Sequence, residues 1–313
     1  MNEKYKEVLA IVSANIIFGL NIPVTKALMA RWMTPSGYTF SRMLFGAIVF
    51  WGISIFTKKE KVTRKDIGII LIGGLIGYVG TQYLFSQSLQ LTSPVIFSLL
   101  MALTPVIVLL ISAVFLKEVI QRRKVFGVIL SISGASLIIL QTQGGSMGSD
   151  NLLGILYSLL CVVCYSVYLI LTREVSKKYQ PVTIVKWMFL VSALAITPFG
   201  YSELPNQYVY SSNTAIMGFI LLGFALMFST LIAFFLLPVA LNRLEASTVS
   251  IFMNLQPIVA SVVAIVVGQD LFTWDKPIAV FLVLAGVYLV TTQTRIMKSN
   301  LIKDDPAIII NYN

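Results

Sequence analysis

Histidine is absent from this chain of 313 residues, and charged side chains make up only 12% of it. A soluble domain carries about a quarter charged residues, so the low charge favours lipid over water as the surrounding solvent. Without histidine the chain lacks the usual metal ligand and the usual proton-exchanging side chain near neutral pH. The thirteen acidic residues fall in termini, in loops or at the ends of apolar runs. No acid–base pair, activated nucleophile or metal cluster is evident, so we expect neither an enzyme nor a bound cofactor or metal ion.

Cysteine is nearly absent as well. Cys161 and Cys164 are the two cysteines, and their C-x-x-C spacing lies inside an apolar run. A redox-active pair with this spacing needs an exposed site that stabilises the thiolate. Their apolar surroundings predict packing residues instead.

Apolar residues, by contrast, make up 57% of the chain, and the mean hydropathy is +0.88. They gather in ten runs, each long enough to cross about 30 Å of hydrocarbon as a tilted helix. The runs are Val8–Met29, Gly37–Phe56, Ile67–Ser86, Pro94–Leu116, Val125–Gln141, Leu152–Thr172, Val182–Phe199, Thr214–Leu236, Ala246–Gly268 and Pro277–Thr294. The first run has no small-residue cleavage site after it, which indicates a retained span and not a signal peptide. The predicted fold class is all-α, a polytopic membrane protein with ten transmembrane helices.

The 23 basic residues are spread unevenly over the expected loops. Eighteen lie at the termini or in loops that follow even-numbered spans, whereas Lys26, Arg31 and Lys276 lie on the opposite side. Arg42 and Lys186 lie inside spans. The positive-inside rule then places both termini in the cytoplasm. The same rule explains the net charge of +10 without nucleic acid as a partner.

The second half of the chain repeats the first at an offset of 152 positions, because Val95–Leu140 aligns without a gap on Ser247–Thr292. Matched pairs include Ser98 and Ser250, Met101 and Met253, Pro105 and Pro257, Glu118 and Asp270, and Gly134 and Gly286. A chance alignment of apolar runs would rarely match a mid-span proline, an acidic loop residue and a glycine together. We expect two five-helix repeats, residues 1–145 and 146–296, followed by a cytoplasmic tail, residues 297–313.

Five spans per repeat is an odd number, so the second repeat must enter the membrane from the opposite side. The loop charges agree, since Lys117–Lys124 is basic and its counterpart Gln269–Lys276 is slightly acidic. Inverted repeats related by a two-fold axis in the membrane plane are an arrangement that permits alternating access.

Each half carries a proline, an acidic residue and a glycine at matching positions. These are Pro105, Glu118 and Gly134 in the first half, and Pro257, Asp270 and Gly286 in the second. Together with the opening segment Asn15–Asn21, this pattern resembles the EamA-type transporters of the drug/metabolite transporter superfamily. The resemblance implies a ten-helix basket in the bacterial inner (plasma) membrane. It also implies a central cavity near the midplane, formed by spans one to four and six to nine.

Two substrate classes remain open from the sequence. One is amino acids or related small metabolites, which the protein would export; the other is organic phosphates or nucleotide sugars, which it would exchange. The second class predicts that Arg42 and Lys186 meet within about 10 Å of each other in one cavity. A membrane scaffold or enzyme is a remote third alternative. The lack of a carboxylate within the spans disfavours cationic substrates and carboxylate-based proton antiport. We therefore expect a zwitterionic or anionic small molecule, and the lipid bilayer, as partners.

Polar groups within spans are costly and are therefore candidate cavity residues. The predicted cavity lining is Asn15, Phe18, Asn21, Arg42, Tyr78, Gln82, Tyr165, Tyr168, Lys186 and Asn254. Arg42 and Lys186 can bind a substrate carboxylate or phosphate, or they can snorkel towards lipid headgroups. The amides, among them Asn254 with its neighbour Gln256, can line a wet cavity or form hydrogen bonds between helices.

Aromatic side chains give a second candidate surface. Tyr157, Cys161, Tyr165 and Tyr168 are spaced three or four residues apart and share one helix face. That face can be a cavity wall for planar or amino-acid substrates, or a packing stripe.

Pro105 and Pro257 lie at equivalent depths in spans four and nine. Each removes one backbone hydrogen bond, so each can be a hinge or a point of static curvature. Gly127 and Gly134 in the fifth span suggest a further helix contact, which leaves a homodimer open.

Overall fold

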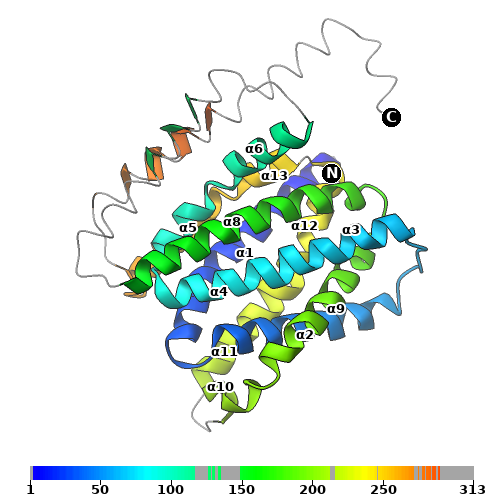
Figure 1. Ribbon diagram of the computed structural model, residues 1–313, viewed down its shortest axis with the longest axis horizontal. Coiled ribbons are helices and arrows are strands. Elements are labelled where there is room, and N and C mark those ends of the chain that lie inside the picture. The colour runs from blue at the N-terminus through cyan, green and yellow to red at the C-terminus, as the bar shows by residue number, and fades with distance from the viewer. Residues whose placement is uncertain are drawn as a thin grey trace, which may run out of the picture.

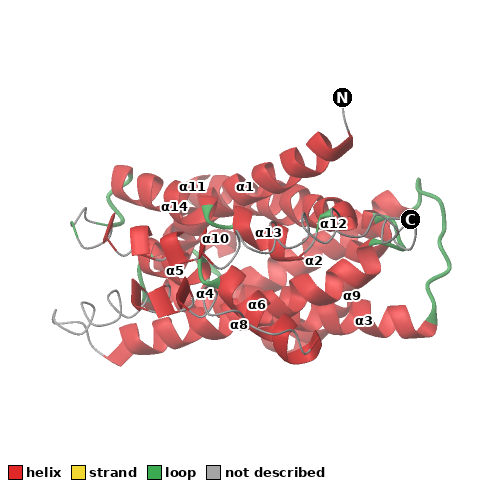
Figure 2. Cartoon of the chain, turned by 90° about the horizontal axis from the view of Figure 1, so that it is seen from above, coloured by secondary structure: helices red, strands yellow, loops and turns green. Residues whose placement is uncertain are grey.

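The computed structural model describes residues 3–116, 149–211, 216–244 and 246–270, with short stretches between 126 and 134 and between 274 and 289. Every regular element in those ranges is a helix (Figure 1, Figure 2). Seven candidate membrane spans are long and apolar enough to cross a bilayer: Lys6–Arg31, Arg64–Leu91, Pro94–Ile111, Leu152–Ser176, Pro181–Gly200, Ile216–Arg243 and Ala246–Val266. The expected span Val125–Gln141 falls mainly outside the described residues, Pro277–Thr294 falls partly outside them, and the expected tail, residues 297–313, lies entirely outside them. The chain is an all-helical, multi-pass membrane protein.

Large apolar side chains cover the outer faces of these helices. Exposed examples are Ile48, Phe56, Leu156, Leu194, Phe199, Ile216, Phe219 and Val262. A water-soluble monomer rarely exposes so much contiguous apolar surface, whereas hydrocarbon solvates it at no cost. The outer faces are therefore suited to lipid.

The 29-residue helix α1 (Glu3–Arg31) packs against helices from both halves of the chain. It contacts α4 (Thr81–Leu91) from the first half, and α12 (Phe234–Arg243) and α14 (Leu255–Val266) from the second. At 1.5 Å per residue it is about 43 Å long, which is more than the hydrocarbon thickness of a bilayer.

Helices α2 (Pro35–Ser54) and α9 (Pro181–Gly200) are both 20 residues long, begin with proline and run antiparallel to each other. Three contacts fix their register: Gly200 lies against Phe40, Gly46 lies against the ring of Phe189, and the Trp51 and Trp187 rings meet edge to face at 5.2 Å. Proline suits the first turn of a helix, where no backbone N–H partner is lost. The α2 helix is not among the seven candidate spans because it is less apolar; it contains Arg42.

Two long helical rods, Arg64–Leu91 and Ile216–Arg243, each contain a π-helical segment, and the two segments lie at matching positions of the repeat. In the first, α3 (Arg64–Gly74) continues through the π segment η1 (Leu75–Gly80) into α4. In the second, α11 (Ile216–Phe224) continues through the π segment η3 (Ala225–Ala233) into α12. Shifted by 152 positions, η1 becomes 227–232 and falls inside η3. Segments of π-helix are rare in proteins, and those that do occur often lie at functional sites.

Glycines let the first rod approach its neighbours closely. A Cβ at Gly73 would lie 2.9 Å from the Met188 side chain of α9, and a Cβ at Gly77 would overlap the Tyr168 ring. Tyr168 belongs to the 28-residue helix α8 (Ser149–Ser176), which lies beside α3 and α4 in Figure 1. The rod is therefore held between α8 and α9 by small residues, as in other membrane helix pairs.

Two helices are interrupted, and the interruptions recur within one residue of the 152-residue offset. The first separates α5 (Pro94–Met101) from α6 (Thr104–Leu116), and the second separates α13 (Ala246–Phe252) from α14. Pro105 has no N–H for the Met101 carbonyl, which accepts instead from the Thr104 hydroxyl at 2.6 Å. The Met253 carbonyl, four residues before Pro257, accepts from the Gln256 N–H at 2.9 Å. Each break therefore lies within one turn before its proline.

Candidate functional site

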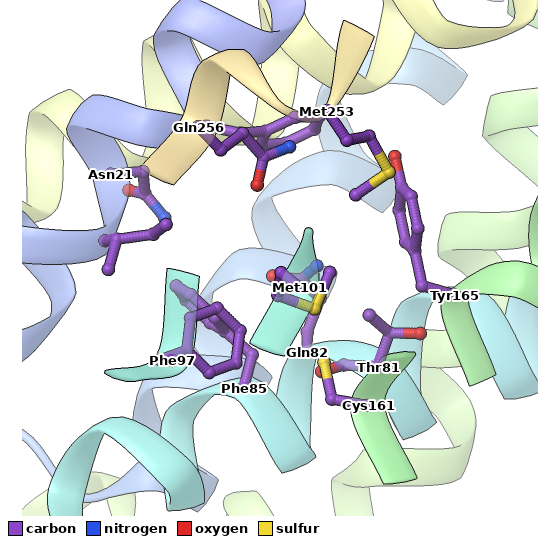
Figure 3. A pocket seen from close by; sticks show the side chains of 12 residues that line it. Asn21, Thr81, Gln82, Phe85, Phe97, Met101, Cys161, Tyr165, Met253 and Gln256 are labelled. Atoms are coloured by element: carbon purple, nitrogen blue, oxygen red, sulfur yellow. The ribbon is translucent and has the colours of Figure 1, made fainter. Parts of the chain in front are cut away.

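A cavity of about 40 Å³ lies among α1, α4, α5, α8 and the α13–α14 break (Figure 3). It is lined by Phe18, Asn21, Ile22, Thr81, Gln82, Phe85, Phe97, Met101, Cys161, Tyr165, Met253 and Gln256. This volume holds about three water molecules, since one water needs about 10–15 Å³ on the same scale. The lining combines an apolar and aromatic wall with three amides.

The cavity sits where the two interrupted helices break. Met101 ends α5 and Met253 follows α13, and these two residues are matched at the 152-residue offset. Both line the cavity, with Met253 above it and Met101 below it in Figure 3. Discontinuous helices are the usual place for a substrate site in transporters, because their free backbone groups and side chains converge there.

The amides on the cavity wall are held by hydrogen bonds to side chains of α1 and α2. Gln256 donates from Nε2 to Asn15 Oδ1 at 2.7 Å, and Asn15 in turn donates from Nδ2 to the Ile11 carbonyl at 2.8 Å. Asn21 donates from Nδ2 to Thr25 at 3.2 Å and to Tyr38 at 3.4 Å. Within the described ranges, its Oδ1 atom is buried and has no hydrogen-bond donor. Asn21, a residue of the cavity wall, therefore carries a buried acceptor that no described group uses.

Arg42 is fully buried, with an exposed fraction of 0%. Its Nε donates to Thr230 Oγ1 at 2.8 Å, and one terminal nitrogen donates to Ser229 Oγ at 2.9 Å. The other terminal nitrogen donates to Gln82 Oε1. All three partners are neutral, and no carboxylate lies within 4 Å of Arg42 among the residues that the structure describes.

Aromatic rings surround the Arg42 guanidinium. Its central carbon lies 5.3 Å from the Tyr38 ring centre and 5.7 Å from that of Phe234, which are cation–π distances. The side chain therefore points into the bundle, so the headgroup-anchor interpretation of Arg42 is wrong.

Lys186 lies at the other end of the α2–α9 pair. Its Nζ stands 5.1 Å from the centre of the Trp51 ring, at the rim of the bundle. Trp51 follows Arg42 by nine residues on α2, which is about 13 Å along a helix axis. Lys186 thus has the position expected of a snorkelling side chain. Among the described residues no contact joins Lys186 to Arg42, so the convergence on which the organic-phosphate alternative depended has no support here.

The predicted tyrosines form two layers. Tyr165 lines the cavity, and its ring lies 5.6 Å from that of Tyr168. The Tyr168 ring lies 5.6 Å from the Tyr78 ring, which packs on Phe234 at 4.4 Å. Tyr78 and Tyr168 are thus a packing layer behind the wall that Tyr165 provides.

Of the ten predicted lining residues, the structure brings Phe18, Asn21, Gln82 and Tyr165 to the cavity. Arg42 and Asn15 lie one side chain behind it, bonded to Gln82 and Gln256. Asn254, Lys186, Tyr78 and Tyr168 are not part of its wall.

Two further wall residues, Gln256 and Cys161, had been offered by the sequence as possible cavity residues, and six had not: Ile22, Thr81, Phe85, Phe97, Met101 and Met253. Two of the six carried a usable signal, because Met101 and Met253 are a repeat-matched pair. Apolar residues such as Ile22 and Phe85 are indistinguishable in sequence from lipid-facing or core residues.

Polar contacts join the two halves of the chain on the side of the basic loops. Asp66 of α3 accepts from Lys178 at 2.9 Å, from the Tyr179 hydroxyl at 2.8 Å and from Thr63 at 2.9 Å. The Asp66 carboxylate raises the pKa of the Lys178 ammonium by this hydrogen bond. Glu60 adds a second link by accepting from the Gln180 N–H at 3.0 Å.

The opposite end of the bundle is joined in a similar way. The turn between α1 and α2 meets the segment that contains η2 (Leu204–Asn206) and α10 (Tyr208–Ser211). The Thr34 N–H donates to Gln207 Oε1 at 2.7 Å, and the Thr34 hydroxyl donates to Glu203. The two halves of the chain are therefore linked at both ends of the helix bundle, on either side of the cavity.

An all-helical membrane bundle with a cavity at two helix breaks defines a transporter-like architecture. The chain matches the EamA-like transporter family over residues 5–140 and again over residues 152–292, so it belongs to that family.

Similar proteins agree with this assignment. The chain is 27% identical to the uncharacterized transporter YyaM of Bacillus subtilis (strain 168), over 86% of this chain and 88% of that protein. It is 24% identical to the uncharacterized inner membrane transporter YhbE of Escherichia coli (strain K12), over 76% of this chain and 74% of that one. A solved crystal structure shares the fold with a TM-score of 0.65 at 17% identity, covering 93% of this chain and 98% of the other.

Proposed function

We propose that this EamA-family transporter moves small zwitterionic or anionic metabolites, such as amino acids and related compounds, across the bacterial inner membrane, with both termini in the cytoplasm. The observation that carries the proposal is the cavity at the two helix breaks, which is backed by one buried cation and three amides. A buried guanidinium suits a carboxylate, and the amides suit polar substituents. We infer no catalytic role for these groups, and the family assignment supports transport.

Alternating access between two inverted five-helix repeats is the mechanism that we propose. It is supported by the antiparallel run of α2 and α9, by the recurrence of π segments and helix breaks at the 152-residue offset, and by the double family match. In this mechanism Pro105 and Pro257 keep the breaks open as hinges. The Asp66 contacts and the Thr34 contacts then open in turn on the two sides of the cavity.

The test is an extracellular metabolite profile of cells that carry the wild-type protein, no protein, or a Tyr165→Ala variant expressed at the same level. We expect one or more small zwitterionic or anionic metabolites to accumulate outside wild-type cells and not in the other two cultures. Profiles that do not differ, or that differ only in cations, would contradict the proposed function.

A further inference from the structure

Arg42 is a buried charged side chain that has no oppositely charged partner among the described residues. A guanidinium has five N–H groups, and with the residues that the structure describes it forms three hydrogen bonds, to Gln82, Ser229 and Thr230. Every one of these partners is neutral, and the side chain has no exposed surface. A buried charge without a countercharge is strongly disfavoured in a medium of low dielectric constant. A chain that maintains such a charge within its spans has a use for an anion beside it.

Gln82 connects Arg42 to the cavity. Its Oε1 accepts from the guanidinium, while the same side chain lines the cavity wall. A carboxylate that enters the cavity reaches Arg42 by taking the place of this one amide oxygen. Two parallel N–H groups can then bond two carboxylate oxygens, which an amide cannot match.

The site can balance one negative charge on a substrate, because Arg42 is the one buried cation beside the cavity among the described residues. Lys186 lies near Trp51, far along α2 from Arg42. Lys26 is half-buried, and its ammonium donates to the Leu89 and Thr92 carbonyls at 2.9 Å each, at the end of α4. A phosphate monoester or a dicarboxylate would therefore carry a second negative charge into the cavity, where the described residues offer no second cation.

The rest of the wall decides what the anion carries. Phe85, Phe97, Met101 and Met253 give the cavity an apolar surface, which favours an aliphatic or aromatic body. Because the cavity holds about three water molecules as it stands, such a body enters only when the wall moves apart. The three amides of the wall, Asn21, Gln82 and Gln256, suit a neutral polar group such as a hydroxyl or an amide N–H. An ammonium group would add a second positive charge beside Arg42, and the twelve lining residues include no carboxylate to balance it.

We propose that Arg42 is the carboxylate-binding residue of this transporter, and that its preferred substrates are organic monocarboxylates of net charge −1 with an apolar body. This inference rests on the proposed function and narrows its substrate class from zwitterionic or anionic metabolites to monoanions, so that amino acids become the weaker ligands. It predicts that a carboxylic acid binds more tightly than the α-amino acid of the same skeleton, and that the corresponding amine does not bind.

Two matched triplets of compounds test the inference on the purified full-length protein in lipid nanodiscs. The first is 3-phenylpropionate, phenylalanine and phenethylamine; the second is hexanoate, norleucine and pentylamine. Binding is measured by the ligand-dependent rise in the midpoint of thermal unfolding and by titration. In each triplet we expect the acid to bind at least about tenfold more tightly than the amino acid, since the extra ammonium is buried unpaired. The amine should have no effect.

Three variants assign the binding to Arg42. Arg42→Gln should weaken binding of the acids by at least about tenfold, the usual effect of losing a charged hydrogen-bond partner. Gln82→Glu places a permanent carboxylate against Arg42, so it should raise the unfolding midpoint without ligand and abolish acid binding. This second variant keeps the inference testable if Arg42→Gln fails to fold. Lys186→Gln removes the same charge elsewhere on the bundle and should bind like the wild type.

The inference is overturned if neither acid binds the wild type, if an amino acid or an amine binds as tightly as its acid, or if Gln82→Glu still binds the acids. None of these outcomes contradicts the proposed transport function, which is tested separately by the extracellular metabolite profile. A wild-type profile that contains amino acids and no monocarboxylate would leave the transporter intact and remove this substrate class.

Discussion

Gln82 lies between Arg42 and the central cavity, and it touches both. Its amide oxygen accepts a hydrogen bond from the buried guanidinium, and its side chain forms part of the cavity wall. The two residues come from α2 and α4, which are packed together, and Ser229 and Thr230 complete the shell from η3. The one deeply buried cation of the described spans is thus held by both halves of the chain, next to the cavity.

Gln82→Leu should therefore destabilise the protein. The substitution keeps the size of the side chain but removes an acceptor from a buried charge, at a cost of about 1.5–3 kcal/mol. The measurement is the free energy of unfolding or the thermal midpoint of the purified protein. Gln87→Leu on the same helix is the control, because Gln87 is only part-buried and bonds the neutral Tyr83 hydroxyl at 2.8 Å. If Gln82→Leu and Gln87→Leu lower the free energy of unfolding equally, the hydrogen bond from Arg42 to Gln82 stabilises the protein no more than an ordinary amide hydrogen bond.

Gly77→Ala should loosen the contact between the first rod and α8. A Cβ at this position would overlap the Tyr168 ring, and such overpacking costs about 1–3 kcal/mol. Gly68→Ala in the same rod meets no atom within 4 Å and should instead stabilise the helix by about 0.5–1 kcal/mol. Thermal unfolding of the two variants side by side checks the opposite signs. A Gly77→Ala protein as stable as the wild type would mean that α8 can shift without cost.

The sequence was sufficient to predict the all-α membrane fold, because long apolar runs and a loop-charge bias leave few alternatives. It also singled out Arg42, Asn21 and Gln82, since polar groups are conspicuous in an apolar span. It could not predict which face of each helix meets the cavity. Gln256 reaches the wall and Asn254 does not, because the helix break before Leu255 sets the direction of each side chain. The π segments, which displace the helix faces at η1 and η3, had no sequence signal either.

Asp66→Asn should open the cavity more often from the side of the basic loops. The change removes the charge that holds Lys178 and weakens the contacts to Tyr179 and Thr63. In a Cys164→Ser background, the native Cys161 reports on the cavity wall through its reaction with N-ethylmaleimide. Because Lys178 is half exposed, we expect a modest rise of about three- to fivefold in the labelling rate.

Glu174→Gln is the matched control for that experiment. Glu174 pairs with Lys177 at 3.9 Å on the surface of the same region, and both side chains are exposed. Such pairs contribute almost nothing to stability. The labelling rate should stay at its wild-type value, and an equal rise in both variants would assign the effect to net charge and not to the Asp66 contacts.

Pro105→Ala should slow transport without lowering stability. An alanine at this position restores an N–H that can bond the Met101 carbonyl, which now accepts from the Thr104 hydroxyl. The restored bond favours a continuous helix across the break by about 1 kcal/mol, which corresponds to about fivefold in the rate of any step that needs the break. Pro94→Ala is the control, because Pro94 stands in the first turn of α5, where proline costs no hydrogen bond. The measurement is the initial rate of uptake into proteoliposomes of whichever metabolite the extracellular profile identifies. If the break only curves the helix, both variants will transport at the wild-type rate; if it is a hinge, Pro105→Ala alone will be slow while its thermal midpoint stays level or rises.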